Sequence, residues 1–225
     1  MADDYLVGQM YAAPDLAEAS ANDPVVLNME RAHDYLRKNF EAINKSRATP
    51  DPMLTADANF MDAMERSDRW LREGAKRMET ARTDAERTIA TLDREMADHL
   101  ALREGTYSSE IRAHFAGLDK NARISALRAA IEAFDKETLA AVLTAPPYLS
   151  GFTPEDQALF HRIYAERHAP KMIARKAVIQ KALDTNFRAY NGAIVEHERM
   201  FPKGEVANVQ ARKEKARKAK EEVVV

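Results

Sequence analysis

Hydrophobic positions recur at steps of three and four residues through one long stretch of the chain, from Asp57 to Arg103. The stretch contains no proline and a single glycine, Gly74, so nothing in it ends a helix. At about 1.5 Å per residue this helix would be roughly 70 Å long, which exceeds the diameter of a compact domain of this size. We therefore predict a long, heptad-like helix over residues 57–105 that needs other helices or another chain beside it.

The apolar stripe of the predicted long helix is a candidate self-association seam, because coiled coils pair through such stripes. Charged Asp68 and Arg82 interrupt the stripe, and its last position is His99. Its large apolar members are Met61, Met64, Leu71, Met78, Ile89, Leu92 and Met96. Stripes rich in methionine and alanine also form ordinary bundle cores, so a core within one chain is the alternative interpretation.

A second long stretch, Lys171–Phe201, also keeps a helical period. Its apolar stripe consists of Ile179, Leu183, Phe187, Tyr190, Ile194, His197 and Phe201. We expect this helix to pack antiparallel on the long helix, because that arrangement covers both stripes and pairs basic with acidic surface. It belongs to a helical return segment over residues 153–202, which opens at the capping sequence Thr153-Pro154 and is interrupted at Pro170.

Caps and prolines divide the remaining chain. The capping pair Asp23-Pro24 predicts a helix that ends near Asn44, and a linker containing two prolines completes residues 23–56. Gly105 is expected to end the long helix in the left-handed conformation. Three short amphipathic patterns within residues 106–152 then predict a small compact cluster of helices followed by a loop.

Two short segments carry the aromatic and apolar residues that are typical of protein contacts. In the loop that follows the short helices, the candidate protein-contact residues are Pro146, Pro147, Tyr148, Leu149 and Phe152. Residues 1–22 carry a similar cluster, which predicts either a frayed terminus or an arm that docks on a neighbouring molecule. The candidate arm residues are Tyr5, Leu6, Met10 and Tyr11.

The composition is that of an all-α protein. Charged residues make up 31% of the chain, and β-branched residues nowhere alternate with polar ones as they do in a strand. The absence of cysteine excludes disulfides and thiolate metal sites. The first residues lack the pattern of a signal peptide and the longest apolar run is too short for a bilayer, so we expect synthesis in the cytoplasm and no membrane contact. We predict an elongated helical bundle or coiled-coil rod with a small compact helical cluster.

Charge is distributed unevenly along the chain. Of the 34 Lys and Arg residues 19 lie in residues 1–156, against 28 of the 36 Asp and Glu residues, so residues 157–225 hold 15 against 8. This asymmetry favours pairing of the two halves, head-to-tail association of copies, or contact of the basic end with nucleic acid. The basic tail, residues 203–225, carries Arg212, Lys213, Lys215, Arg217, Lys218 and Lys220. A solvated tail without a partner is the alternative, and no aromatic residue follows Phe201 to stack on bases.

No constellation for catalysis or metal binding is complete in the sequence. Glu30 and His33 have the spacing of a di-iron helix motif, but the second such pair and two further glutamates are missing. His161 and His168 share a helix face without a carboxylate placed beside them. Nucleophile elbows and phosphate-binding glycine loops are also absent. We expect no enzyme activity, no cofactor and no metal.

Three segments between Glu110 and Pro170 carry a resemblance to known proteins: RISALRAAI from Arg123, LTAPPYLSGFTPE from Leu143, and HAP from His168. This part of the chain resembles uncharacterised helical proteins encoded among bacteriophage and prophage structural genes. The plan of an acidic coiled segment followed by a basic helical tail is also similar to that of phage scaffolding and internal virion proteins. The resemblance implies a structural role in a virion or in its assembly.

These observations lead to three hypotheses. In the first, the chain is a non-enzymatic helical structural or assembly protein of a phage particle, acting as an oligomer with itself and other structural proteins of the particle as partners. In the second, it is a nucleic-acid-associated accessory protein that binds through its basic tail. In the third, which the sequence supports least, it is a small helical enzyme or metal protein.

Overall fold

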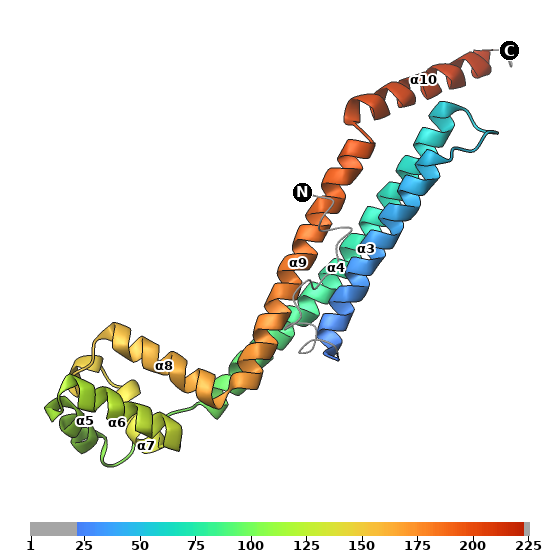
Figure 1. Ribbon diagram of the computed structural model, residues 1–225. Coiled ribbons are helices and arrows are strands. Elements are labelled where there is room, and N and C mark those ends of the chain that lie inside the picture. The colour runs from blue at the N-terminus through green and yellow to red at the C-terminus, as the bar shows by residue number, and fades with distance from the viewer. Residues whose placement is uncertain (1–21, 223–225) are drawn as a thin grey trace. The chain divides into compact units, whose positions relative to one another are not determined.

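A computed structural model of the chain describes residues 22–222, and every regular element in that range is a helix. The elements are α3 (Pro24–Ala48), α4 (Ala56–His99), α5 (Ser108–Gly117), α6 (Lys120–Ala133), α7 (Lys136–Leu143), the 3-10 helix η1 (Pro147–Ser150), α8 (Pro154–His168), α9 (Pro170–Met200) and α10 (Lys203–Glu222) (Figure 1). The predicted all-α class is therefore confirmed. Helix α4 extends over 44 residues, as the long periodic stretch indicated.

The chain divides into two compact units. Of the described residues, unit 1 contains 22–88 and 177–222, and unit 2 contains Ile89–Lys176. Unit 1 thus holds α3, most of α4, most of α9 and α10, whereas unit 2 holds α5 to α8 and the adjoining ends of α4 and α9.

Side-chain caps begin several helices where the sequence predicted them. The Asp23 carboxylate accepts hydrogen bonds from the backbone N–H groups at the start of α3, and Pro24 occupies its first turn. Thr153 and Asp156 form a reciprocal capping box at the start of α8. A further cap, Asp135, begins α7 with a single side-chain bond, which its carboxylate accepts from the N–H of Thr138 at 3.1 Å.

Two predicted helix ends were wrong. Helix α3 continues past Asn44 to Ala48 and stops only because Pro50 follows closely. Helix α4 ends at His99, and Gly105 does not adopt the left-handed conformation. The earlier end of α4 releases Leu100 and Leu102 from the helix, and both then pack against the core of unit 2.

Helices α3, α4 and α9 lie side by side in unit 1 (Figure 1) and are joined by buried hydrogen bonds. The indole Nε1 of Trp70 in α4 donates to the carbonyl oxygen of Leu36 in α3 at 3.1 Å. The amide Nδ2 of Asn186 in α9 donates to the carbonyl oxygen of Met29 in α3 at 3.2 Å. Side chains from two helices thus reach the backbone of α3, which fixes the register of the three helices.

Within unit 1, α9 runs antiparallel to α4, and this prediction is confirmed. The rings of Phe60 and Phe201 are 5.5 Å apart, and Ser67 Oγ lies 2.8 Å from Nδ1 of His197. Residue numbers therefore fall along α9 as they rise along α4.

The buried faces of α4 and α9 lie mostly one residue away from the predicted apolar stripes. In unit 1 the buried residues of α4 are Ala63, Ser67, Trp70, Gly74, Met78, Ala81 and Ala85. The buried residues of α9 after Val178 include Ile179, Ala182, Asn186, Ala189, Gly192, Ala193, Glu196 and Met200. Small side chains dominate both faces, because they let the helix backbones approach closely. The larger apolar side chains flank these contacts.

Unit 2 has its own hydrophobic core, built by α5 to α8 and the segments between them. Its most deeply buried members are Leu127, Ile131, Leu139 and Val142. Aromatic rings extend the core, with Phe152 lying 5.7 Å from Phe160 in an edge-to-face arrangement. The compact unit is larger than the predicted cluster over residues 106–152, since it also includes α8.

Candidate interaction surfaces

An open groove of about 380 Å³ runs between α4 and α9 in unit 1, and we call it the α4–α9 groove. It is lined by Ala75, Met78, Glu79, Arg82, Leu183, Asn186, Phe187 and Tyr190. Most of these side chains are apolar. Phe187 is 67% exposed, which is unusual for a phenyl ring on a helix that packs in a bundle.

The groove exists because the closest contacts between α4 and α9 use small residues. Ala182 and Ala189 of α9 are fully buried, and this leaves their larger neighbours Leu183 and Tyr190 at the flank of the contact. The predicted stripe of α9 therefore lies mainly beside the core of unit 1. Sequence periodicity marked where the large apolar residues are, but it missed which face is buried.

Asn186 connects the groove to the interior of unit 1. Its side chain is 5% exposed, and its Nδ2 is bonded to α3, whereas its buried Oδ1 has no hydrogen-bond partner in the part of the chain that the structure describes. At the rim, Arg82 donates two hydrogen bonds to Glu79 at 2.8 and 3.1 Å, which lower the pKa of that carboxyl group. The rim charges thus cancel each other locally.

The candidate seam of α4 is only partly covered by the chain itself. Met78 is 9% exposed in unit 1 and Leu92 is 3% exposed in unit 2. The other five seam residues are half-buried: Met61, Met64, Leu71, Ile89 and Met96. Self-association through these five residues stays a prediction.

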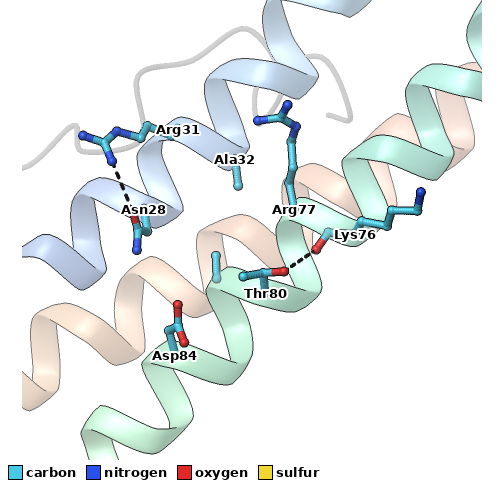
Figure 2. Close-up of a pocket in the computed structure, with 8 residues that line it drawn as sticks. Asn28, Arg31, Ala32, Lys76, Arg77, Thr80 and Asp84 are labelled. Carbon is cyan, nitrogen blue, oxygen red and sulfur yellow. Dashed lines mark hydrogen bonds between the residues drawn. The ribbon is translucent and has the colours of Figure 1, made fainter.

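A second pocket, of about 320 Å³, lies between α3 and α4 of unit 1, and we call it the basic pocket. Ala32 and Ala81, each 3% exposed, form its floor, because two facing alanines leave space between the helices. Figure 2 shows the longer polar side chains that surround this floor. They belong to Asn28, Arg31, Lys76, Arg77, Thr80 and Asp84.

In unit 2 the contact loop, Pro146–Phe152, has regular structure over most of its length. It contains η1 and turns at Gly151, whose φ of 73° is left-handed. Tyr148 is 73% exposed and Leu149 is 42% exposed, so these two predicted contact residues are available to a partner. Phe152 is 7% exposed and belongs to the core instead. Of the two prolines, Pro146 is exposed and Pro147 is half-buried.

A side chain from α6 bonds to this loop, and one from α8 bonds to the chain just before it. The Gln157 amide donates to the carbonyl oxygens of Val142, Leu143 and Ala145 at the end of α7, at 2.8 to 3.3 Å. The Arg123 guanidinium donates to the carbonyl oxygen of Gly151. The exposed pair of apolar side chains therefore sits on a firm base, which lowers the entropy that binding would cost.

The basic tail forms helix α10 rather than an irregular segment. Among residues 203–221 of this helix only Val209, 2% exposed, is buried, and residues 210–221 are all exposed. Arg212 donates two hydrogen bonds of 2.7 Å to Asp57, which lower the pKa of that carboxyl group. Arg217 pairs with Glu214 and Glu221, and Lys218 lies 4.0 Å from Glu214. Within residues 22–222 the remaining cations of the tail, Lys213, Lys215 and Lys220, make no ion pair.

The candidate arm residues Tyr5, Leu6, Met10 and Tyr11 lie outside the described residues. Among the residues that are described, no group of three or more His, Asp or Glu side chains is placed to hold a metal ion. Both histidines considered as metal ligands on one helix face bond to backbone instead, His161 to the carbonyl oxygen of Leu143 and His168 to that of Ile131. These contacts give both rings a structural role.

Hydropathy adds one exclusion: no helix formed between residues 22 and 222 has an apolar stretch that could cross a bilayer. Comparison with protein-family models, with curated proteins and with solved structures finds no match to this chain.

Proposed function

We propose that this chain is a non-enzymatic helical assembly protein that pairs with a second copy of itself through the α4–α9 groove, as a structural or scaffolding component of a phage particle. One observation carries the proposal. An apolar groove and a protruding phenyl ring, that of Phe187, occupy the same face of unit 1. A groove beside a knob is the arrangement by which helical faces interlock.

A second copy fits this face better than an unrelated partner for two reasons. In a twofold dimer the same patch meets itself, so each copy can insert its Phe187 ring into the groove of the other. The charges at the rim, Glu79 and Arg82, are already paired within each copy and do not repel their equivalents. By helical spacing, the half-buried Met64 and Leu71 extend the apolar surface along α4.

The phage assignment rests on the resemblance of the segment from Glu110 to Pro170 and on the general plan of the chain. Particle components repeat one contact many times, and long helices with a self-complementary face suit that task. Tyr148 and Leu149 of the contact loop would then contact other proteins of the particle, since exposed aromatic and aliphatic side chains on a firm base are typical interface anchors.

We expect Phe187→Ser to weaken self-association of the full chain about thirtyfold. Burying the exposed part of the phenyl ring is worth about 1 kcal/mol in each copy, so the substitution removes about 2 kcal/mol from the dimer. Sedimentation velocity over a range of protein concentrations measures the dissociation constant. The matched control is Val195→Ser, which removes another exposed apolar side chain, 53% exposed, from the same helix outside the groove.

The control should leave the dissociation constant within about twofold of the unsubstituted chain, because surface changes outside an interface cost little. A full chain that stays monomeric at every concentration would overturn the proposal. So would equal weakening by the two substitutions, since the groove would then have no special part in association.

A second candidate function, nucleic-acid binding through α10, is favoured by Lys213, Lys215 and Lys220. Their ammonium groups are exposed and make no ion pair within the described range, so they are free to contact phosphates. Under this hypothesis the logarithm of the DNA-binding constant should fall with the logarithm of salt concentration with a slope of about −3, one unit for each phosphate contact.

Fluorescence anisotropy with duplex DNA at several salt concentrations measures this slope. Replacing the three lysines by glutamine should abolish the binding. As the control, glutamine at Arg212, Arg217 and Lys218 removes the same formal charge from cations that already have carboxylate partners, and it should reduce binding less. Binding that is insensitive to salt, or equal losses in both variants, would remove this candidate.

A further inference from the structure

The basic pocket between α3 and α4 is lined by more cationic than anionic side chains. Three of its polar side chains are cationic, those of Arg31, Lys76 and Arg77, and one is anionic, that of Asp84. Lys76 pairs with Glu73 at 2.9 Å, and Asp84 pairs with Arg87 at 3.3 Å.

Neither arginine makes an ion pair within residues 22–221, although the Glu73 carboxyl, which Lys76 binds, also lies within the electrostatic reach of Arg77. Arg31 donates to the amide oxygen of Asn28 at 3.3 Å, and the guanidinium of Arg77 lies 4.4 Å from the centre of the Tyr35 ring. Both side chains are exposed. Figure 2 shows Arg31 turned toward Asn28 and Arg77 extending from α4 toward α3. A guanidinium held in this way keeps free N–H donors, and carboxylates are the groups that match them best.

The sequence before α3 has the opposite charge. Residues 1–21 contain four acidic side chains and no Lys or Arg, and the first basic residue of the whole chain is Arg31, in the pocket itself. The acidic residues are Asp3, Asp4, Asp15 and Glu18. We propose that the basic pocket is the docking site for the chain's own acidic N-terminal segment, with carboxylates of residues 1–21 bound by Arg31 and Arg77.

The connection between the two is short enough for docking within one molecule. Arg31 follows the capping residue Asp23 by eight residues, and eight residues extend about 12 Å along a helix. Asp15 precedes Asp23 by the same number of residues and can reach up to about 27 Å from it when extended. The tether is therefore long enough for the Asp15 and Glu18 carboxylates to reach the pocket. The short tether also gives the segment a high effective concentration there, which no free acidic partner shares.

Disulfide trapping tests the proposal in the full chain, which has no cysteine of its own. One variant combines Ala17→Cys with Thr80→Cys at the pocket. The control combines Ala17→Cys with Arg82→Cys, two residues further along α4 and on the side that lines the α4–α9 groove. In a glutathione redox buffer we expect the intramolecular disulfide to form at least about tenfold faster in the pocket variant, because docking raises the effective concentration of the two thiols.

Two further variants test the chemistry of the contact. Arg31→Ser with Arg77→Ser, and separately Asp15→Asn with Glu18→Gln, should each slow trapping at Thr80 about fivefold, since two exposed ion pairs together contribute about 1 kcal/mol. Molar salt should have the same effect. Equal trapping rates at Thr80 and Arg82, or rates insensitive to these substitutions, would overturn the proposal. Disulfide-linked dimers in place of the cross-linked monomer would overturn docking within one chain.

Discussion

Replacing Trp70 by alanine is expected to lower the free energy of unfolding of unit 1 by about 3–5 kcal/mol, the range for truncation of a large buried aromatic residue. The indole is 2% exposed and packs beside the ring of Phe40, with ring centres 6.1 Å apart. Its Nε1 also donates the buried hydrogen bond to the carbonyl oxygen of Leu36. The substitution therefore removes packing between α3 and α4 and one of their few polar links.

Because Trp70 is the only tryptophan, its own fluorescence cannot report on the variant. Circular dichroism at the helical minimum during urea unfolding gives the loss of stability, and amide hydrogen exchange shows where it occurs. Exchange should accelerate over residues 24–48 and remain unchanged over residues 120–143 in unit 2. Trp70→Phe, which keeps a ring but loses the donor, should cost about 1–2 kcal/mol.

A suitable control is Arg69→Ala on the adjacent, exposed position of α4. It should change stability by no more than about 0.5 kcal/mol. If Trp70→Ala lowered the free energy of unfolding no more than this control, the packing of Trp70 between α3 and α4 would not stabilise unit 1.

Trp70 also illustrates what sequence periodicity could and could not reveal. Heptad steps through α4 passed over it, because they follow the more numerous methionines and leucines. The buried face is decided instead by where backbones come closest. At Gly74 a Cβ atom would lie 2.5 Å from Cδ2 of Leu36, so the Leu36 side chain of α3 occupies the space over this glycine and would have to move for any larger residue.

Local signals were more reliable than the stripes. Caps at Asp23, Asp135 and Thr153 depend on hydrogen bonds within a few residues, so the sequence contains nearly everything that determines them. The end of α4 depends on contacts of Leu100 with a distant part of the chain, and the sequence around Gly105 could not reveal these.

The candidate sites follow the same division. Tyr148 and Phe152 belong to one short loop, and composition alone could not separate the exposed ring from the buried one. The basic pocket was missed because Arg31 and Arg77 lie far apart in sequence and are ordinary surface residues of their helices. Only the packing of α3 on α4 places both arginines beside the same pocket.

Residues of the three segments quoted from the stretch between Glu110 and Pro170 come together in unit 2. Arg123, the first residue of one segment, donates to Gly151 in another, and its guanidinium lies 5.6 Å from the centre of the Phe152 ring. His168, in the third, bonds to the carbonyl oxygen of Ile131 at 2.6 Å. These contacts stabilise unit 2, and that stabilising role is sufficient to explain why the three segments occur in one chain.

Replacing Arg123 by methionine is expected to lower the free energy of unfolding of unit 2 by about 2–4 kcal/mol. Its side chain donates to the carbonyl oxygens of Phe115 at 2.9 Å and Leu118 at 2.7 Å, at and just beyond the end of α5, where the last carbonyl groups of a helix lack their usual donors. The Phe115 oxygen accepts one other bond, from the backbone N–H of Leu118 at 3.2 Å. It also donates to Gly151 in the contact loop. Methionine fills similar space but leaves these partly buried acceptors without a charged donor.

Urea unfolding and amide exchange over residues 108–118 and 147–152 measure this effect, with Arg128→Met on an exposed position of α6 as the control. Arg123→Lys should recover little stability, because one compact ammonium group cannot reach all the carbonyl oxygens to which the planar guanidinium donates. Faster exchange in the loop would show that Arg123 also keeps Tyr148 and Leu149 in position for a partner. If Arg123→Met matched Arg128→Met, the loop would owe its order to Phe152 and Gln157 alone, and its firm base would not depend on α6.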